Sequence, residues 1–133
     1  MALKKSSAQM VAEARARIEE LSVEELKAIL DDPKTLVVDI RDVRERQRLG
    51  FIPGSYHAPR GMLEFWVDPE SPYHKEVFSE DRKFVLHCAA GWRSALSAAT
   101  LQDMGFEAAH LDGGFAAWAE AGEAIEHPET KRP

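Results

Sequence analysis

Apolar residues are concentrated in two short runs of the chain, and these runs predict buried β-strands. The first run is Leu36–Ile40 and the second lies within Lys83–Cys88. A nearly continuous apolar run of this length is typical of a strand that is covered on both faces, as in a parallel sheet. Two weaker runs, Tyr56–Ala58 and Ala108–Leu111, predict shorter strands.

Helices are predicted around and between these strands. Residues 7–20 carry apolar side chains at helical spacing, which gives this exposed segment one apolar stripe. Ser22 and Glu25 match a capping box, so a second helix should run to about Leu30. The stripe consists of Met10, Val11, Ala14 and Ile18, and further helices are predicted over residues 42–49, 61–67, 94–104 and 115–121.

Strands that alternate with helices predict an α/β fold with a parallel sheet flanked by helices, and residues 7–20 add an extra N-terminal helix. We expect three segments: an N-terminal helical extension over residues 1–20, one domain over 21–125 and a flexible polar tail over 126–133. In such sheets, ligands bind beyond the carboxyl ends of the strands. Asp39 and Cys88 lie at two of these ends.

The net charge and the cysteine count bear on where the protein acts and on what it binds. The chain has 133 residues, a formal net charge of −6 and one cysteine. A single cysteine excludes an intramolecular disulfide framework and suits a reducing compartment, so we expect a cytoplasmic protein. We find no secretory signal and no membrane-spanning run, and the negative charge argues against nucleic-acid binding. The arginines at 44, 46 and 48 are interpreted as a solvated helix face.

Cys88 is the strongest candidate for chemistry. It ends an apolar strand, a short loop over Ala89–Trp92 follows, and Arg93 and Ser94 open an alanine-rich helix. Unpaired N–H groups and the helix dipole at this place favour an anion, so the thiol should lose its proton more easily than a free one. A lone cysteine is more often a small buried hydrophobe. Here the small residues and the arginine that follow favour a nucleophile.

Four motifs occur in series, and together they resemble the rhodanese-like sulfurtransferases in their single-domain form. They are Val38–Arg41, Gly50–Ala58, Cys88–Ser94 and Leu111–Trp118, and they span about residues 22–122. Each motif alone would be weak, whereas the four in this order are specific. The opening helix lies outside the core that the resemblance covers.

The resemblance implies a doubly wound α/β domain that carries sulfane sulfur as a persulfide on Cys88. The donor would be thiosulfate or an organic or protein persulfide. The acceptor would be a thiol of a small molecule or a protein, or cyanide, and no cofactor would be needed. Arg93 would pair with Asp39 to hold the loop, with Arg41 as a further support. The persulfide-binding loop would consist of Ala89, Ala90, Gly91, Trp92, Arg93 and Ser94, whose N–H groups stabilise the anion.

One position departs from the family pattern. The family often has a basic residue directly after the cysteine, whereas this chain has Ala89. A less charged site should recruit a dianion such as thiosulfate less well and favour an organic persulfide or a protein donor. Trp92 either lines the mouth of the site or packs against the sheet. Phe65–Trp66 and residues 69–74 are a candidate wall of the site or a contact surface, and packing is equally compatible with them.

Two other functions remain open. The segment His87–Ser94 echoes the signature of cysteine phosphatases, although those have one residue more between cysteine and arginine, which makes a wider cradle. A rhodanese-like module used for protein binding or regulation is the other alternative. The histidines show no metal-ligand spacing with Cys88, and strand alternation should turn His87 away from the loop. They are His57, His74, His87, His110 and His127.

Overall fold

A five-stranded parallel sheet forms the centre of the computed structural model, which describes residues 2–128. Its strand order is β1-β5-β4-β2-β3, and every neighbouring pair is parallel. The longest pairing joins β2 to β4, with Thr35 opposite Lys83 and Asp39 opposite His87. The strands are β1 (Glu20–Leu21), β2 (Thr35–Asp39), β3 (Tyr56–His57), β4 (Lys83–His87) and β5 (Ala108–Leu111).

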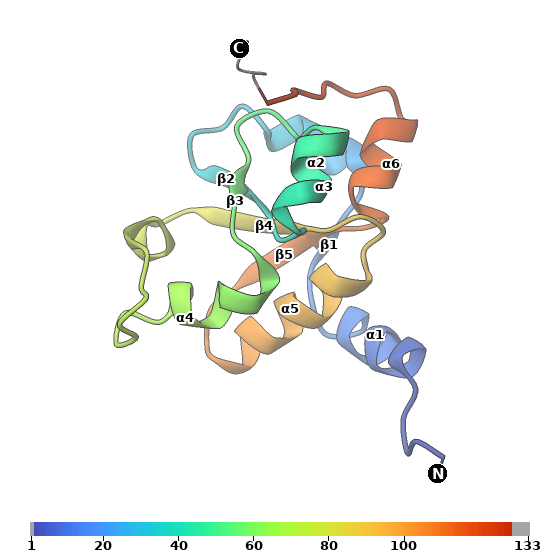
Figure 1. Ribbon diagram of the computed structural model, residues 1–133, viewed down its shortest axis with the longest axis vertical. Helices are drawn as coiled ribbons and strands as arrows, with labels where there is room; N and C mark the ends of the chain where they lie inside the picture. The colour runs from blue at the N-terminus through green and yellow to red at the C-terminus, as the bar shows by residue number, and fades with distance from the viewer. Residues whose placement is uncertain (1, 129–133) are drawn as a thin grey trace.

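Helices cover both faces of this sheet, so the predicted doubly wound α/β fold is confirmed (Figure 1). α2, α3 and α6 lie on one side, while α4 and α5 lie on the other. Alternation along the strands separates two cores: Val38 and Leu86 face the α4–α5 side, whereas Val37 and Val85 face the other. The helices are α1 (Ser7–Arg15), α2 (Val23–Ile29), α3 (Val43–Leu49), α4 (Leu63–Val67), α5 (Trp92–Asp103) and α6 (Gly114–Glu120), with short 3-10 turns η1 (Arg60–Met62) and η2 (Glu76–Ser79).

Local signals explain where several helices begin and end. Ser22 caps α2 with the capping box that the sequence predicted, and Asp42 caps α3 in the same way through Glu45. At the end of α5, Gly105 has a φ of 89° and the N–H of Phe106 donates to the carbonyl of Leu101. This is the glycine-ended helix expected at that position.

The N-terminal segment differs from its prediction. α1 ends at Arg15 rather than continuing to residue 20, and Glu20–Leu21 form β1 at the edge of the sheet beside β5. A strand of two residues is too short to show a period in the sequence. α1 packs on α5, where Val11 and Ala14 are buried with Ala95 and Ala99.

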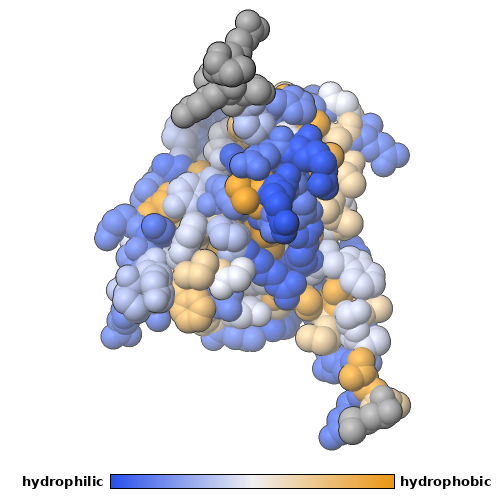
Figure 2. Space-filling model, in the orientation of Figure 1, coloured by the Kyte–Doolittle hydropathy of each residue, from blue (hydrophilic) through white to orange (hydrophobic). Residues whose placement is uncertain are grey.

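The predicted tail begins with an ordered contact. Glu126 pairs with Phe51 in an antiparallel bridge, with N–H···O distances of 2.8 and 2.9 Å in the two directions. Residues 129–133, where the rest of the predicted flexible tail falls, lie outside the described residues. The space-filling view shows a largely hydrophilic face with scattered apolar patches (Figure 2).

Candidate active site

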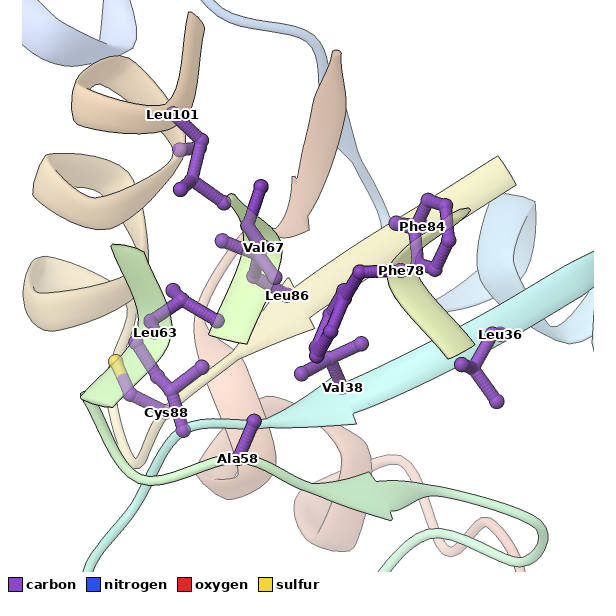
Figure 3. Close-up of a cluster of buried hydrophobic side chains, with 12 residues drawn as sticks. Leu36, Val38, Ala58, Leu63, Val67, Phe78, Phe84, Leu86, Cys88 and Leu101 are labelled. Atoms are coloured by element: carbon purple, nitrogen blue, oxygen red, sulfur yellow. The ribbon is translucent and has the colours of Figure 1, made fainter. Parts of the chain in front are cut away.

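Cys88 follows the last residue of β4, and α5 begins four residues later at Trp92. The side chain is 1% exposed and belongs to the buried cluster that contains Ala58 and Leu63 (Figure 3). Gly91 makes the turn from strand to helix with a φ of 101°, a conformation that other residues resist. The carboxyl end of a central strand therefore presents sulfur beneath a short loop.

Two backbone N–H donors and one hydroxyl group contact the sulfur. The N–H groups of Gly91 and Ser94 donate to Cys88 Sγ over 3.1 and 3.4 Å, and Ser94 Oγ lies 3.5 Å from it. Burial by itself raises the pKa of the Cys88 thiol, but the hydrogen bonds from Ser94 and the loop amides outweigh it and lower that pKa below its ordinary value. The site thus favours a thiolate.

α6 holds two carbonyl groups at the start of the cysteine loop. The N–H of Phe115 donates to Cys88 O over 2.8 Å, and the N–H of Ala116 donates to Ala89 O over 2.9 Å. Gly114, with a φ of 60°, permits this approach: a Cβ atom there would lie 2.7 Å from Cys88 O. Gly114, the first residue of α6, therefore lets this helix approach the loop around Cys88.

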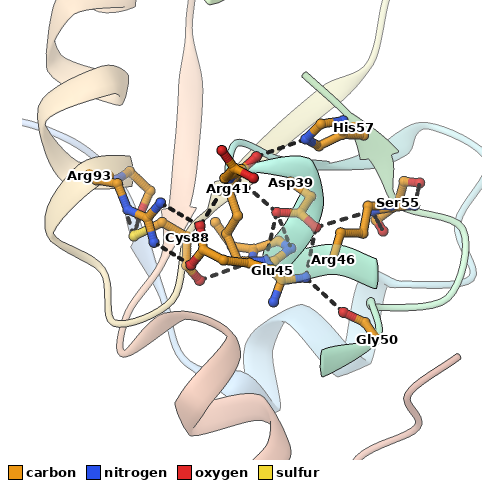
Figure 4. Close-up of polar contacts among 12 residues, drawn as sticks. Asp39, Arg41, Glu45, Arg46, Gly50, Ser55, His57, Cys88 and Arg93 are labelled. Carbon is orange, nitrogen blue, oxygen red and sulfur yellow. Dashed lines mark hydrogen bonds and ion pairs between the residues drawn. The ribbon is translucent and has the colours of Figure 1, made fainter. Parts of the chain in front are cut away.

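Arg93 does not pair with Asp39, so that expectation is wrong. Its two terminal nitrogens each donate to the carboxylate of Glu45 over 2.9 Å (Figure 4). Glu45 also accepts from the N–H of Asp42 at the start of α3. The hydrogen bond to Glu45 is the main cause that raises the pKa of Arg93, and the charge of Cys88 adds to it. Arg93 therefore ties the loop to α3.

Asp39 is instead held by two other arginines. Arg41 donates to both of its carboxylate oxygens, over 2.9 and 2.8 Å, and Arg46 donates to Oδ2 over 3.1 Å (Figure 4). Arg41 also donates to Gly50 O over 2.8 Å, and its side chain and that of Asp39 are fully buried. Burial raises the pKa of Asp39, but the hydrogen bonds from Arg41 and the charges of Arg41 and of protonated His87 lower it to about 2. This cluster braces β2 and α3 beneath the site.

Arg46 was interpreted as part of a solvated helix face, and the structure corrects this. Its side chain is 15% exposed and donates to Ser55 Oγ and O in addition to Asp39. Arg44 and Arg48 are exposed, as expected. A basic residue every second position on a helix cannot place all of its members on one face, so one of the three turned inward.

His87 lies on the face of the sheet opposite to Cys88, as strand alternation predicted. Its ring stacks with that of Phe115, and Nδ1 lies 3.1 Å from Cys88 O. Complete burial lowers the pKa of His87 to about 4, even though Asp39 acts against that shift. His87 is therefore a neutral residue of the core near the loop.

Two residues near the loop were missed in the sequence. Glu45 binds Arg93, and His110 is buried with Nδ1 at 2.9 Å from Ser94 Oγ. Glu45 had a local signal, since it forms a capping box with Asp42. His110 had no such signal, because nothing in the sequence distinguishes a single histidine on a short predicted strand from the other histidines. We find no group of three or more His, Cys, Asp or Glu side chains placed to hold a metal ion within residues 2–128.

The remaining predicted positions lie at the surface. Trp92 is 53% exposed at the start of α5, so it does not pack against the sheet. Ala89 is partly exposed directly after Cys88. Phe65 and Tyr73 are also exposed and form an edge-to-face pair with centroids 6.4 Å apart, whereas Trp66 is partly buried against the core.

Comparison with known proteins decides the family. The Rhodanese-like domain family matches residues 22–121. This chain belongs to the rhodanese-like family. The resemblance seen in the four sequence motifs is thereby confirmed. A sulfurtransferase of Allochromatium vinosum is 32% identical over 114 residues, which cover 84% of this chain and 98% of that protein.

Two further relatives differ in name and length. Thiosulfate sulfurtransferase/rhodanese-like domain-containing protein 3 of Mus musculus is 31% identical over 71% of this chain, and the match covers 64% of the mouse protein. A solved structure from Rhodopseudomonas palustris CGA009 is 49% identical with a TM-score of 0.90, covering 95% of this chain and 98% of that one. That protein is described as one of unknown function and a possible tyrosine phosphatase. The rhodanese-like relatives named as sulfurtransferases indicate sulfurtransferase-type activity for the family. None of the described helices is long and apolar enough to cross a membrane.

Proposed function

We propose that this protein transfers sulfane sulfur through a persulfide on Cys88. The observation that carries the proposal is the pair of backbone donors to Cys88 Sγ, the N–H groups of Gly91 and Ser94. Such donors stabilise a thiolate before reaction and an anionic persulfide after it. The lowered pKa of Cys88 supports the same chemistry.

The first half of the reaction loads the sulfur. The Cys88 thiolate attacks the outer sulfur of thiosulfate, the S–S bond of the donor breaks, and sulfite leaves with the bonding electron pair. An organic or protein persulfide reacts in the same way and releases its thiolate. The product is an anionic persulfide, with the outer sulfur beside the loop amides.

The second half returns Cys88 to its starting state. An acceptor thiolate, or cyanide in vitro, attacks the outer sulfur, and the bond to Cys88 Sγ breaks with the electron pair returning to Cys88. Dividing the transfer into two displacements is covalent catalysis. Cys88 itself carries the sulfur, so the proposed reaction uses no cofactor.

Ala89 supports a preference among donors. The residue after Cys88 offers no positive charge for a dianion, while Trp92, three residues further along the chain, presents an exposed apolar surface. We therefore propose an organic or protein persulfide as the better donor and a small thiol or a protein thiol as the acceptor. One family relative, from Bacillus subtilis, is named a putative sulfur carrier protein. A reducing compartment such as the cytoplasm would keep Cys88 available for this role.

Intact mass spectrometry tests the persulfide directly. The purified protein is incubated with thiosulfate or with glutathione persulfide, and Cys88→Ser serves as the control. We expect a gain of one sulfur atom that cyanide removes and that the variant never shows. No gain with either donor would contradict the proposal.

A second candidate, hydrolysis of phosphate esters, is favoured by the similarity to the Rhodopseudomonas palustris protein described as a possible tyrosine phosphatase. Two features argue against it. Only four residues separate Cys88 from Arg93, and the guanidinium of Arg93 is already engaged by Glu45. An aryl phosphate assay on the same preparations decides: Cys88-dependent hydrolysis without persulfide formation would favour the phosphatase. If neither activity is found, a rhodanese-like module for protein binding or regulation would be the remaining function.

A further inference from the structure

A line of hydrogen-bonded side chains leads from Cys88 away from the loop and out to the N-terminal helix. Cys88 Sγ lies 3.5 Å from Ser94 Oγ, and Ser94 Oγ lies 2.9 Å from His110 Nδ1. The other ring nitrogen, His110 Nε2, lies 2.9 Å from Glu20 Oε2. Arg15 of α1 donates to the same carboxylate oxygen over 2.8 Å. Every member between sulfur and carboxylate is thus in contact with the next.

The chemistry of the groups gives this line one direction. Burial raises the pKa of Glu20, but hydrogen bonds from His110 and Arg15 outweigh it and lower that pKa, so the carboxylate is ionised and only accepts. His110 Nε2 must then carry a hydrogen. In the neutral ring this makes Nδ1 an acceptor, which at 2.9 Å takes the hydroxyl hydrogen of Ser94 in preference to the carbonyl of Gly91, 3.5 Å from Ser94 Oγ. Ser94 Oγ is left to accept from the thiol of Cys88.

We propose that Ser94, His110 and Glu20 form a proton relay that takes the thiol proton of Cys88 before it attacks a sulfur donor. The Cys88 S–H bond breaks as its proton moves to Ser94 Oγ, and the hydroxyl proton of Ser94 moves to His110 Nδ1. Ser94 remains a neutral hydroxyl, His110 becomes an imidazolium held by the carboxylate of Glu20, and the hydroxyl hydrogen now faces the thiolate. The relay rests on the proposed function only in assigning Cys88 as the reacting atom.

The charge of Glu20 favours this transfer, and it must outweigh burial, which opposes a positive charge on the His110 ring. His110 is 1% exposed, so its ring is shielded from solvent and its nearest charged partner counts strongly. Glu20 of β1 supplies that partner, and Arg15 of α1 fixes Glu20 while also pairing with the exposed Asp112 after β5. Arg93 of α5 is paired with Glu45. The side chain of Glu19 turns instead to Lys83.

Two of the residues lie outside the part of the chain that the family shares. The rhodanese-like match begins at residue 22, whereas Arg15 and Glu20 precede it. The N-terminal segment therefore contributes a carboxylate to the relay that the matched core does not contain. Ser94 contacts the sulfur directly, while His110 and Glu20 act through it as positioning and proton-holding residues.

The alkylation rate of Cys88 as a function of pH tests the relay without any sulfur transfer, because Cys88 is the only thiol in the chain. Iodoacetamide is used with wild type, Glu20→Gln and His110→Asn. We expect both substitutions to raise the pKa of Cys88 by about one, so that alkylation at neutral pH slows about tenfold and recovers at high pH. Glu19→Gln, which removes the same charge one residue earlier, should leave the profile unchanged. Profiles of Glu20→Gln and His110→Asn that superimpose on the wild type would overturn the relay.

A reciprocal measurement uses a folded protein whose relay is intact except for sulfur. Replacing Cys88 removes the hydrogen-bond partner of Ser94 and should therefore change how Ser94 bonds to His110. We expect the ring nitrogen signals of His110 in NMR spectra at one neutral pH to move in Cys88→Ala relative to wild type, while those of His74 stay where they are. Unchanged His110 signals would also overturn the relay. Failure of persulfide formation alone would contradict the proposed function and leave both of these results standing.

Discussion

Arg93 and Glu45 join the cysteine loop to the helix that follows β2. The pair has two parallel hydrogen bonds of 2.9 Å, and the same carboxylate caps α3 through the N–H of Asp42. One side chain therefore fixes both the start of a helix and the last turn of the loop. Since the loop amides must point at Cys88 Sγ, the position of Arg93 bears on the reactivity of the sulfur.

Replacing Glu45 separates its two roles. Gln retains the capping hydrogen bond at this position but removes the charge that holds Arg93. We expect Glu45→Gln to cost at most about 1 kcal/mol of unfolding free energy and to reduce sulfur transfer by about tenfold, because the loop loses its anchor. Glu24→Gln, in the first turn of α2, is the matched control. Chemical denaturation and a cyanide-acceptor assay measure the two effects, and equal activity in both variants would contradict the anchoring role.

Asp39 should contribute mainly to stability. It is fully buried between Arg41 and Arg46, so Asp39→Asn leaves two guanidinium groups without their counter-charge. Breaking a buried pair in this way costs about 3–5 kcal/mol. Asp103→Asn, which breaks the exposed pair with Arg17, should cost about 1 kcal/mol or less. Urea denaturation compares the two, and similar losses would show that the Asp39 cluster does not brace the fold.

Acid should lower the free energy of unfolding over two pH ranges. The pKa of His87 is lowered from 6.5 to about 4, so the folded state binds fewer protons and the stability that the neutral ring provides is lost as the pH falls between these values. The loss amounts to about 3 kcal/mol. The pKa of Asp39 is lowered from 3.8 to about 2, so its contribution disappears below the first range. Denaturation at a series of pH values should show a flatter profile between pH 6.5 and 4 in His87→Gln; an unchanged slope would count against the neutral buried ring.

Gly114 should not tolerate a side chain because a Cβ atom there would collide with the cysteine loop, whereas Gly122 has free space around it. Both Gly114 and Gly122 have positive φ angles, but a Cβ at Gly114 would meet Cys88 O at 2.7 Å, whereas nothing lies within 4 Å of one at Gly122. We expect Gly122→Ala to cost about 1 kcal/mol through backbone conformation alone. Gly114→Ala should cost more and also slow alkylation of Cys88. Thermal melts and iodoacetamide kinetics test this, and two variants with the same behaviour would argue against close packing as the cause.

A positive charge after the nucleophile should improve the use of thiosulfate. We expect Ala89→Lys to raise kcat/KM for thiosulfate about tenfold at low salt, with the gain shrinking as ionic strength rises. The same charge placed on α6 by Ala119→Lys should have little effect. Steady-state kinetics with thiosulfate and with an organic persulfide would show the change. A gain that is equal for both donors, or independent of salt, would mean that charge is not what limits thiosulfate.

The fold could be predicted from the sequence because its signals are local. The apolar runs of β2 and β4, the capping box of α2 and the glycine after α5 each mark an element within a few residues. β1 was missed because two residues show no period. α1 was predicted to be too long, since the apolar stripe includes Ile18, which packs against the core from beyond the helix.

The partners of the candidate site were harder to predict because they depend on tertiary geometry. Arg93 was expected to pair with Asp39. That carboxylate is instead bound by Arg41, two residues along the chain, through its backbone N–H and its side chain. Arg93 then meets Glu45, whose capping box had already been formed by its own helix. His110 and Ser94 are 16 residues apart and meet only because β5 lies beside β4 in the sheet. The spacing of these residues in the sequence therefore does not predict their contact.

Both edge strands of the sheet are only two residues long: β1 lies next to β5, and β3 lies next to β2. A long edge strand offers a row of free N–H and C=O groups on which another molecule can add a strand of its own. Here each outermost strand ends before such a row can form, and α1 and β1 belong to the same short segment. Shortening the chain to the residues shared with its family would uncover β5, with Ala108–Leu111 as the new border of the sheet. We therefore expect a chain shortened in this way to aggregate more readily than the full chain.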